Sequence, residues 1–159
     1  MPLSNMFQDQ VQPLKPSLVE RLNPPVYWLS GDVTRQHADV YSRTYPKTIL
    51  INSDGGDVAA ALAIYDALSG RDIDTVATGA CQSAATIVLQ AGQVRYATPH
   101  TYFRVHPVEG SYRKSMVDNI IHWIYSKKMD CASIIEAYDL ETFDAITAQR
   151  LGLIDKILE

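Results

Sequence analysis

The sequence has little cysteine and no long apolar run. Its two cysteines, Cys81 and Cys131, are far apart and have no neighbours at metal-ligand spacing. A disulfide-rich secreted scaffold is therefore excluded, no metal site is expected, and the composition suits a reducing cytoplasm. No apolar stretch approaches the roughly 20 residues that a helix needs to span a bilayer. The first residues also lack a basic region followed by an apolar one, so we expect a cytoplasmic protein with no signal peptide and no membrane partner.

The chain also lacks an excess of basic charge. Its formal net charge is −4, which argues against nucleic acid as a partner. Hydrophobic residues make up 47% and charged residues 20% of the chain, as in an ordinary soluble protein. With 159 residues the chain fits one domain, and a chain of this size buries roughly two thirds of its unfolded surface.

Prolines and glycines divide the sequence into elements. Residues 1–22 are polar and contain Pro2, Pro13 and Pro16, so we expect an arm or a short capping helix there and a single domain over residues 23–159. Strands are expected at about 25–33, 47–53, 74–79, 94–98 and 101–108, and helices at about 35–45, 57–70, 82–90, 114–138 and 145–151. This alternation predicts an α/β domain with a mostly parallel sheet flanked by helices.

Two segments follow buried strands and carry residues suited to chemistry. In Asn52-Ser53-Asp54-Gly55-Gly56 the paired glycines let the backbone approach a bound group, although they equally suit a tight turn. Ser83 stands where a strand passes into a helix, so its hydroxyl can point outward beside free helix amides. The segment is not a G-x-S-x-G elbow, because no glycine stands two residues after Ser83, and the serine equally suits a helix cap.

His106 is the third candidate. It lies at the end of an expected strand, and histidine is a natural general base because its ordinary pKa is close to the working pH. A purely structural histidine is the alternative. His37 and His122 fall on expected helices and His100 lies in a turn, so they are weaker candidates.

Together these segments resemble the proteolytic subunit of the Clp protease, a serine peptidase with the crotonase-like fold, in a shortened form. The likeness covers residues 17–158 in the family's order. It rests on SLVERLNPPVYWLSGDV, INSDGGDVAAALAIYDAL, TGACQSAATIVLQAG, VRYATPHTYFRVHP and AITAQRLGLIDKIL. The resemblance implies a fold of repeated ββα units, a polypeptide substrate, no cofactor, assembly into a homo-oligomeric ring and an ATP-driven unfoldase as partner.

The resemblance also implies a role for each site residue. Ser83 would be the nucleophile, His106 its base, and the amides of Gly56 and Ala84 the oxyanion hole. The acid is harder to place, because the segment between the expected long helix and the last helix is contracted. Counting back from the last helix puts the acid on Leu140, and a shift of one residue favours Asp139 over Glu141.

Several positions depart from the family's pattern. Asp54 replaces the usual proline, Ala84-Ala85 follow the serine in place of Met-Gly, and Pro107 follows His106 without an intervening glutamine. Asp144 suits an N-cap of the last helix better than a catalytic acid. These departures leave two alternatives to the peptidase, which are an inactive family member that acts as a structural subunit and another acyl-transfer enzyme of the crotonase fold. A Ser-Lys dyad finds no lysine between Lys47 and Lys114.

Overall fold

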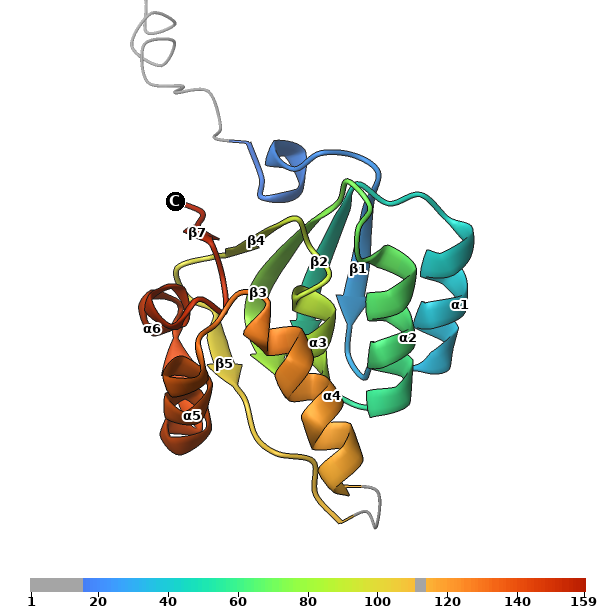
Figure 1. Ribbon diagram of the computed structural model, residues 1–159. Coiled ribbons are helices and arrows are strands. Elements are labelled where there is room, and N and C mark those ends of the chain that lie inside the picture. Colours follow the sequence, from blue (N-terminus) through green and yellow to red (C-terminus); the bar gives the residue numbers. More distant parts are fainter. Residues whose placement is uncertain (1–15, 111–113) are drawn as a thin grey trace, which may run out of the picture.

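The computed structural model describes residues 16–110 and 114–159 (Figure 1). Most of the expected arm lies outside these residues, and the part that is described contains one 3-10 turn, η3 (Val19–Arg21). The strands are β1 (Val26–Ser30), β2 (Thr48–Ser53), β3 (Asp74–Gln82), β4 (Val94–Ala97), β5 (Tyr102–Arg104), β6 (Thr142–Asp144) and β7 (Lys156–Ile157). The helices are α1 (Arg35–Arg43), α2 (Val58–Leu68), α3 (Ala84–Leu89), α4 (Lys114–Ser126), α5 (Cys131–Leu140) and α6 (Ala145–Leu151).

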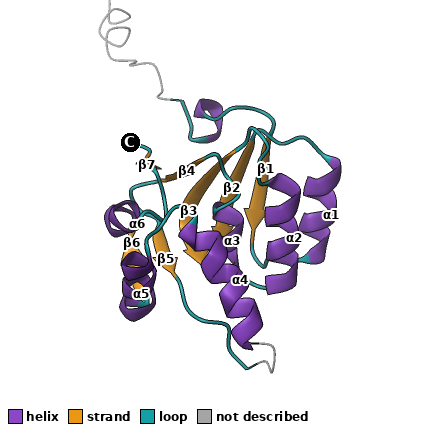
Figure 2. Cartoon of the chain, in the orientation of Figure 1, coloured by secondary structure: helices purple, strands orange, loops and turns teal. Residues whose placement is uncertain are grey.

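The strands form one mostly parallel sheet that forks at β3. The main path runs β1-β2-β3-β4-β7, and among the described strand pairs only β5–β6 is antiparallel. The first half of β3, residues 74–77, pairs with β4, whereas residues 80–82 pair with β5. In the view of Figures 1 and 2, α1 and α2 lie to the right of β1, α4 passes in front of β3 and α3, and α5 and α6 lie beside β5. The predicted α/β class with a mostly parallel sheet is therefore confirmed.

A bulge opens the fork. Ile51 pairs with Ala77 but Ser53 pairs with Cys81, so β3 carries two extra residues opposite β2. The side chain of Asn52 covers the bulge, since its Oδ1 accepts a hydrogen bond from the Ala80 N–H at 3.1 Å. The second half of β3 is thereby directed toward β5 and ends at Gln82, immediately before Ser83.

A buried arginine fixes the C-terminal segment to the sheet. Arg95 on β4 is 1% exposed, and its Nε and Nη2 donate to the Asp155 carboxylate at 3.0 and 2.7 Å. Its Nη1 donates to Gln90 Oε1 at 2.7 Å and to two carbonyls before β7. Burial alone would raise the pKa of Asp155, but the hydrogen bonds and charge of Arg95 outweigh it and hold that pKa below its ordinary value.

The structure corrects three element boundaries. The expected helix over 114–138 is wrong, because the chain breaks into α4 and α5 at a turn in which Asp130 accepts a hydrogen bond from the Ser133 N–H at 2.7 Å. Such an N-cap satisfies the free amides of a new helix. The expected helix over 82–90 begins two residues later, since β3 extends to Gln82, and the expected strand over 101–108 is only β5. The short strands β6 and β7 were not expected.

Over residues 16–110 and 114–159, no helix has both the length and the apolar character required to cross a membrane.

Candidate functional site

Ser83 occupies a strained turn between β3 and α3. Its backbone has φ 52° and ψ −125°, a conformation that residues other than glycine rarely adopt. Such conformations cost about 1–3 kcal/mol and gather at functional sites. A strand-to-helix turn with this strain is the geometry of a nucleophile elbow, which holds a serine hydroxyl out from the backbone. The elbow is tied to β5, because the Ser83 N–H donates to the Arg104 carbonyl at 2.8 Å.

The glycine turn after β2 packs directly on this elbow. A Cβ atom added at Gly55 would lie 2.9 Å from Ser83 Cβ, and one added at Gly56 would lie 2.6 Å from the Val33 carbonyl. Both glycines also have positive φ. The Val33 N–H donates to the Gly55 carbonyl at 2.8 Å and so holds the turn in place. Both positions therefore require glycine, because Gly55 packs closely on Ser83 and Gly56 on the Val33 backbone. A simple turn would require only the positive φ.

Two backbone amides beside the elbow are free to bind a ligand. These are the N–H groups of Gly56 and Ala84, the expected oxyanion donors. Among the residues that the structure describes, no acceptor is found for either N–H. Ala84 is the first residue of α3, where a helix leaves its amides without an internal partner.

His106 lies just beyond β5, and its ring is held by the next peptide. Its Nδ1 lies 2.8 Å from the Pro107 carbonyl oxygen. Since a carbonyl only accepts, this contact places the proton on Nδ1 and leaves the lone pair of Nε2 free to act as a base. The segment after it is anchored to α4, because the Val108 N–H donates to Asp118 Oδ1 at 2.8 Å.

Ser83 and His106 line the same cavity, which has a volume of about 150 Å³. No hydrogen bond joins their side chains in the described structure, although both residues line this one cavity. The other lining residues are Val58, Ala84, Ile87, Val108, Glu109, Ile121 and Tyr125. Most of these are apolar, and the cavity therefore suits an apolar side chain next to the two polar groups. Sequence reasoning missed the lining of α4, whose Ile121 and Tyr125 carry only the signal of a buried helical face.

Neither expected acid forms a hydrogen bond or a salt bridge with His106 in the described part of the chain. Asp139 is exposed in the last turn of α5, and Glu141 is exposed with φ 60°. The antiparallel pairing of β5 and β6 ends at Arg104 opposite Thr142, two residues before His106. No described residue donates a hydrogen bond to the side-chain carboxylate of Asp139 or Glu141, whereas Asp144 caps α6 as expected by accepting from the Thr147 N–H at 2.8 Å. That bond holds the pKa of Asp144 below its ordinary value.

His37 has a structural role. Its Nδ1 accepts a hydrogen bond from the Thr34 N–H at 3.1 Å at the start of α1, which is the reciprocal half of a capping box. Burial lowers the pKa of this imidazole. Because the Nδ1 lone pair already accepts the Thr34 N–H, His37 is a weaker candidate for a general base than His106.

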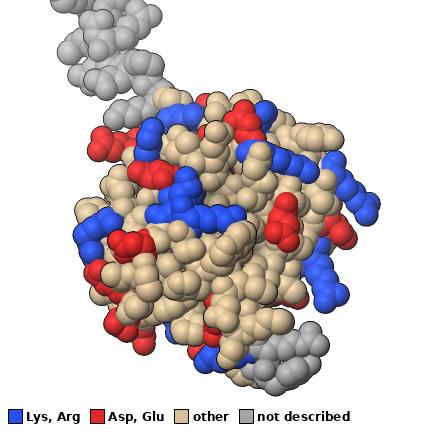
Figure 3. All heavy atoms as spheres, viewed as in Figure 1, with Lys and Arg blue, Asp and Glu red and all other residues tan. Residues whose placement is uncertain are grey.

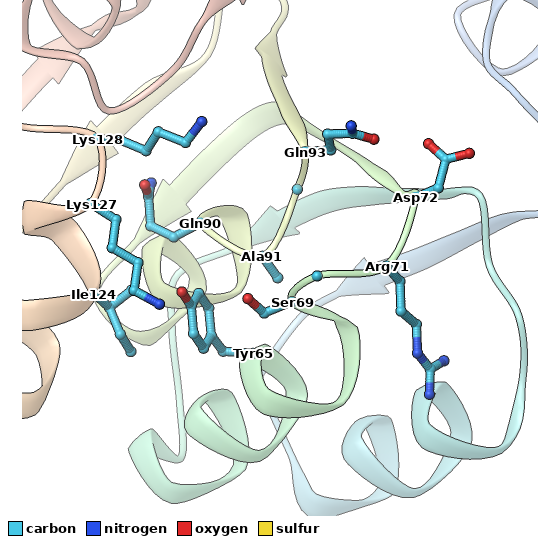
Figure 4. A pocket seen from close by; sticks show the side chains of 12 residues that line it. Tyr65, Ser69, Arg71, Asp72, Gln90, Ala91, Gln93, Ile124, Lys127 and Lys128 are labelled. Atoms are coloured by element: carbon cyan, nitrogen blue, oxygen red, sulfur yellow. The ribbon is translucent and has the colours of Figure 1, made fainter.

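A larger cavity of about 400 Å³ lies away from these residues, near the C-terminal ends of α2, α3 and α4 (Figure 4). Lys127 and Lys128 line it from the turn that follows α4, and Lys127 Nζ lies 3.9 Å from the centre of the Trp123 ring. Cations are stabilising at helix C-termini, so these lysines have a structural explanation.

Positive and negative side chains are interspersed over the face in Figure 3, and no single sign of charge covers it. Within the described ranges no group of three His, Cys, Asp or Glu side chains could hold a metal ion.

Comparison with known proteins identifies the family. Residues 38–159 match the family model of Clp protease. Among solved structures, the chain is similar to ClpP1 from Listeria monocytogenes, with 21% identity and a TM-score of 0.72 over 84% of this chain and 91% of that one. A mutant of the same protein matches with 20% identity and a TM-score of 0.69 over the same shares of the two chains. The ClpP protease catalytic domain from Plasmodium falciparum matches with 22% identity and a TM-score of 0.71, over 84% of this chain and 85% of that one. The family match covers most of the sequence, and the chain therefore belongs to the Clp protease family.

Proposed function

We propose that the chain is a serine endopeptidase of the Clp type that cleaves polypeptides through an acyl-enzyme on Ser83. One observation carries the proposal: Ser83, in a strained elbow, lines the same small cavity as His106, whose Nε2 accepts no hydrogen bond from a described residue. The N–H groups of Gly56 and Ala84 beside the elbow have no acceptor within the described ranges. Membership of the Clp protease family supports a polypeptide substrate and assembly into a homo-oligomeric ring served by an ATP-driven unfoldase.

In the proposed reaction, His106 Nε2 takes the Ser83 hydroxyl proton as Oγ attacks the substrate carbonyl carbon. The negative charge that develops on the carbonyl oxygen is stabilised by the N–H groups of Gly56 and Ala84. The C–N bond then breaks, and His106 gives its proton to the leaving amine. Water, deprotonated by the same imidazole, hydrolyses the acyl-enzyme and restores the Ser83 hydroxyl.

Asp139 is the proposed acid behind His106. Arg104 pairs with Thr142, so the end of α5 and the segment that leads to His106 adjoin the same end of the β5–β6 pair, which supports this choice. To act, Asp139 has to replace the Pro107 carbonyl at Nδ1. The carbonyl fixes the ring's tautomer, but it carries no full negative charge and stabilises the imidazolium less than a carboxylate does.

A fluorophosphonate probe tests the assignment, because it reacts covalently with activated serine hydroxyls. We expect labelling of the wild-type protein, none of Ser83→Ala, and much slower labelling of His106→Gln. Ser69→Ala is the control, since Ser69 lines the larger cavity and its removal should leave labelling unchanged. Full labelling of Ser83→Ala would show that the nucleophile lies elsewhere.

A second candidate function is a catalytically weak or inactive subunit that contributes to an assembly. The position of His106 favours it, because the ring contacts a backbone carbonyl and no described carboxylate. A protein that forms a ring in light scattering, yet neither labels nor cleaves a fluorogenic peptide, would support this function over the first.

A further inference from the structure

A chain of hydrogen bonds connects α4 to the backbone of the candidate nucleophile. The Tyr125 phenol oxygen lies 2.5 Å from Thr86 Oγ1, and Thr86 Oγ1 donates to the Ser83 carbonyl at 2.6 Å. Since the threonine has one hydroxyl hydrogen and directs it at Ser83, the tyrosine hydroxyl must be the donor to Thr86. The chain therefore has one direction, from Tyr125 through Thr86 to the Ser83 carbonyl.

This chain is buried along its whole length. Thr86 is 0% and Tyr125 3% exposed, so water does not compete for these hydrogen bonds. The Ser83 carbonyl also accepts the Thr86 N–H at 2.9 Å, which gives it two donors on the inner side of the elbow. Buried hydrogen bonds in series polarise and strengthen one another, so the orientation of this carbonyl is firmly set.

The orientation of that carbonyl determines where the Ala84 N–H points. The Ser83 C=O and the Ala84 N–H belong to one planar trans peptide, in which the two bonds point in opposite directions. Holding the carbonyl against Thr86 therefore aims the Ala84 N–H away from Thr86. That N–H has no acceptor among the described residues, and Ala84 lines the cavity shared by Ser83 and His106.

We infer that Thr86 and Tyr125 are positioning residues that lock the Ser83–Ala84 peptide so that its N–H serves as an oxyanion donor. The inference rests on the proposed function and adds to it a pair of buried hydrogen bonds that hold the strained elbow. The Clp-like sequence segments do not indicate these bonds. Without the two side chains, the carbonyl keeps only the Thr86 N–H as a donor, and the peptide is held less firmly in the productive geometry.

The test uses Thr86→Val, which keeps the side-chain shape but removes the hydroxyl, together with Tyr125→Phe and the double variant. Complete loss of one oxyanion donor typically costs about 100- to 1000-fold in kcat, so a misaimed donor should cost roughly 10- to 100-fold in Thr86→Val. Tyr125→Phe should cost less, because Thr86 still reaches Ser83. The double variant should be no worse than Thr86→Val, which already disconnects the tyrosine, and Thr86→Ser should restore the rate.

Tyr41→Phe is the matched control for stability. Tyr41 is 2% exposed and donates to the Trp28 carbonyl at 2.6 Å, so its variant loses a comparable buried hydrogen bond between α1 and β1. Both tyrosine variants lose one buried hydrogen bond and should lower the melting temperature similarly. Only Tyr125 is linked to Ser83, so only Tyr125→Phe should slow fluorophosphonate labelling. Equal slowing in both would mean that loss of stability, and not positioning, accounts for the effect.

Steady-state kinetics on a fluorogenic peptide separate the remaining outcomes. A positioning role lowers kcat and leaves KM nearly unchanged, because the oxyanion exists only during the reaction. A rise in KM with unchanged kcat would instead make Tyr125 a substrate contact and overturn the inference. Unchanged kcat in Thr86→Val, alongside an inactive Ser83→Ala, would refute the positioning role alone, whereas an active Ser83→Ala would refute the proposed function.

Discussion

Replacing Gly55 with alanine should disable the candidate site while leaving the fold intact. Gly55 is buried, has φ 117°, and lies against the elbow rather than in it. A Cβ atom at this position would lie 2.9 Å from Ser83 Cβ, 3.1 Å from the Gln82 carbonyl oxygen and 3.4 Å from the Ala84 nitrogen. The substitution therefore acts on the nucleophile and on an oxyanion donor at the same time.

The size of the effect follows from these distances. Carbon atoms make their best contact at about 3.5–4.0 Å, so the Ser83 Cβ has to move by roughly 0.6–1.1 Å. A misplacement of about 1 Å at a reacting centre can cost about 100-fold in rate. Crowding of the Ala84 N–H adds to this, and we expect fluorophosphonate labelling of Gly55→Ala to slow by at least about 100-fold. The backbone strain of alanine at a positive φ should cost about 1–3 kcal/mol of stability as well.

Gly70→Ala separates the clash from the backbone strain. Gly70 also has a positive φ, of 81°, but a Cβ there would meet nothing within 4 Å. Its alanine variant should lose a similar amount of stability and label at the wild-type rate. Labelling of a folded Gly55→Ala protein at the wild-type rate would refute the packing of the glycine turn on the Ser83 elbow, and with it the proposed geometry of the site.

Two further predictions concern stability. The free energy of unfolding of Ser83→Gly should exceed that of Ser83→Ala by about 1 kcal/mol, because glycine adopts φ 52° without strain and both variants lack the hydroxyl. Ser83→Gly should therefore unfold at a higher urea concentration, and equal midpoints would show that the elbow stores no strain. Asp155→Ala should cost about 3–5 kcal/mol near pH 7, because it leaves the buried Arg95 guanidinium without its counter-charge. Since the folded-state pKa of Asp155 is lowered, its contribution is present above the unfolded pKa of about 4 and is lost as pH falls through the folded value, so denaturation curves of the two proteins should converge in acid and a constant gap would contradict the ion pair.

The parts of the fold that could be predicted are those with a strong local signal. The continuous apolar run of β2 indicated a strand buried on both faces, and Ile49, Leu50 and Ile51 are fully buried. Thr34 and Asp144 indicated the starts of α1 and α6. The break between α4 and α5 was missed because apolar residues continue at helical spacing through it. Only the cap at Asp130 marks the new helix, and an aspartate on an exposed helix face looks the same in sequence.

The elbow shows why the site was harder to predict than the sheet. In the G-x-S-x-G pattern, glycines beside the serine provide room for the sharp turn. Here the residue two after Ser83 is Ala85, which is small and fully buried, and the space next to the serine comes from Gly55 in a separate turn. The requirement for glycine has thus moved to a residue 28 positions away. A motif search along the chain cannot detect it, and the link from Tyr125 to Thr86, across 39 positions, is hidden for the same reason.

The acid is the residue that spacing is least able to identify. In a regular helix each residue turns its side chain by about 100° relative to the one before, so an error of one position redirects the carboxylate completely. The chain here is not regular, because α5 ends at Leu140 and Glu141 has φ 60° before β6 begins. The directions of Asp139 and Glu141 are therefore set by this one reversal and by the β5–β6 pairing, both of which depend on tertiary structure. Counting residues back from α6 leads to Leu140 at the end of α5, and the choice between Asp139 and Glu141 stays a prediction, because it depends on the backbone reversal at Glu141.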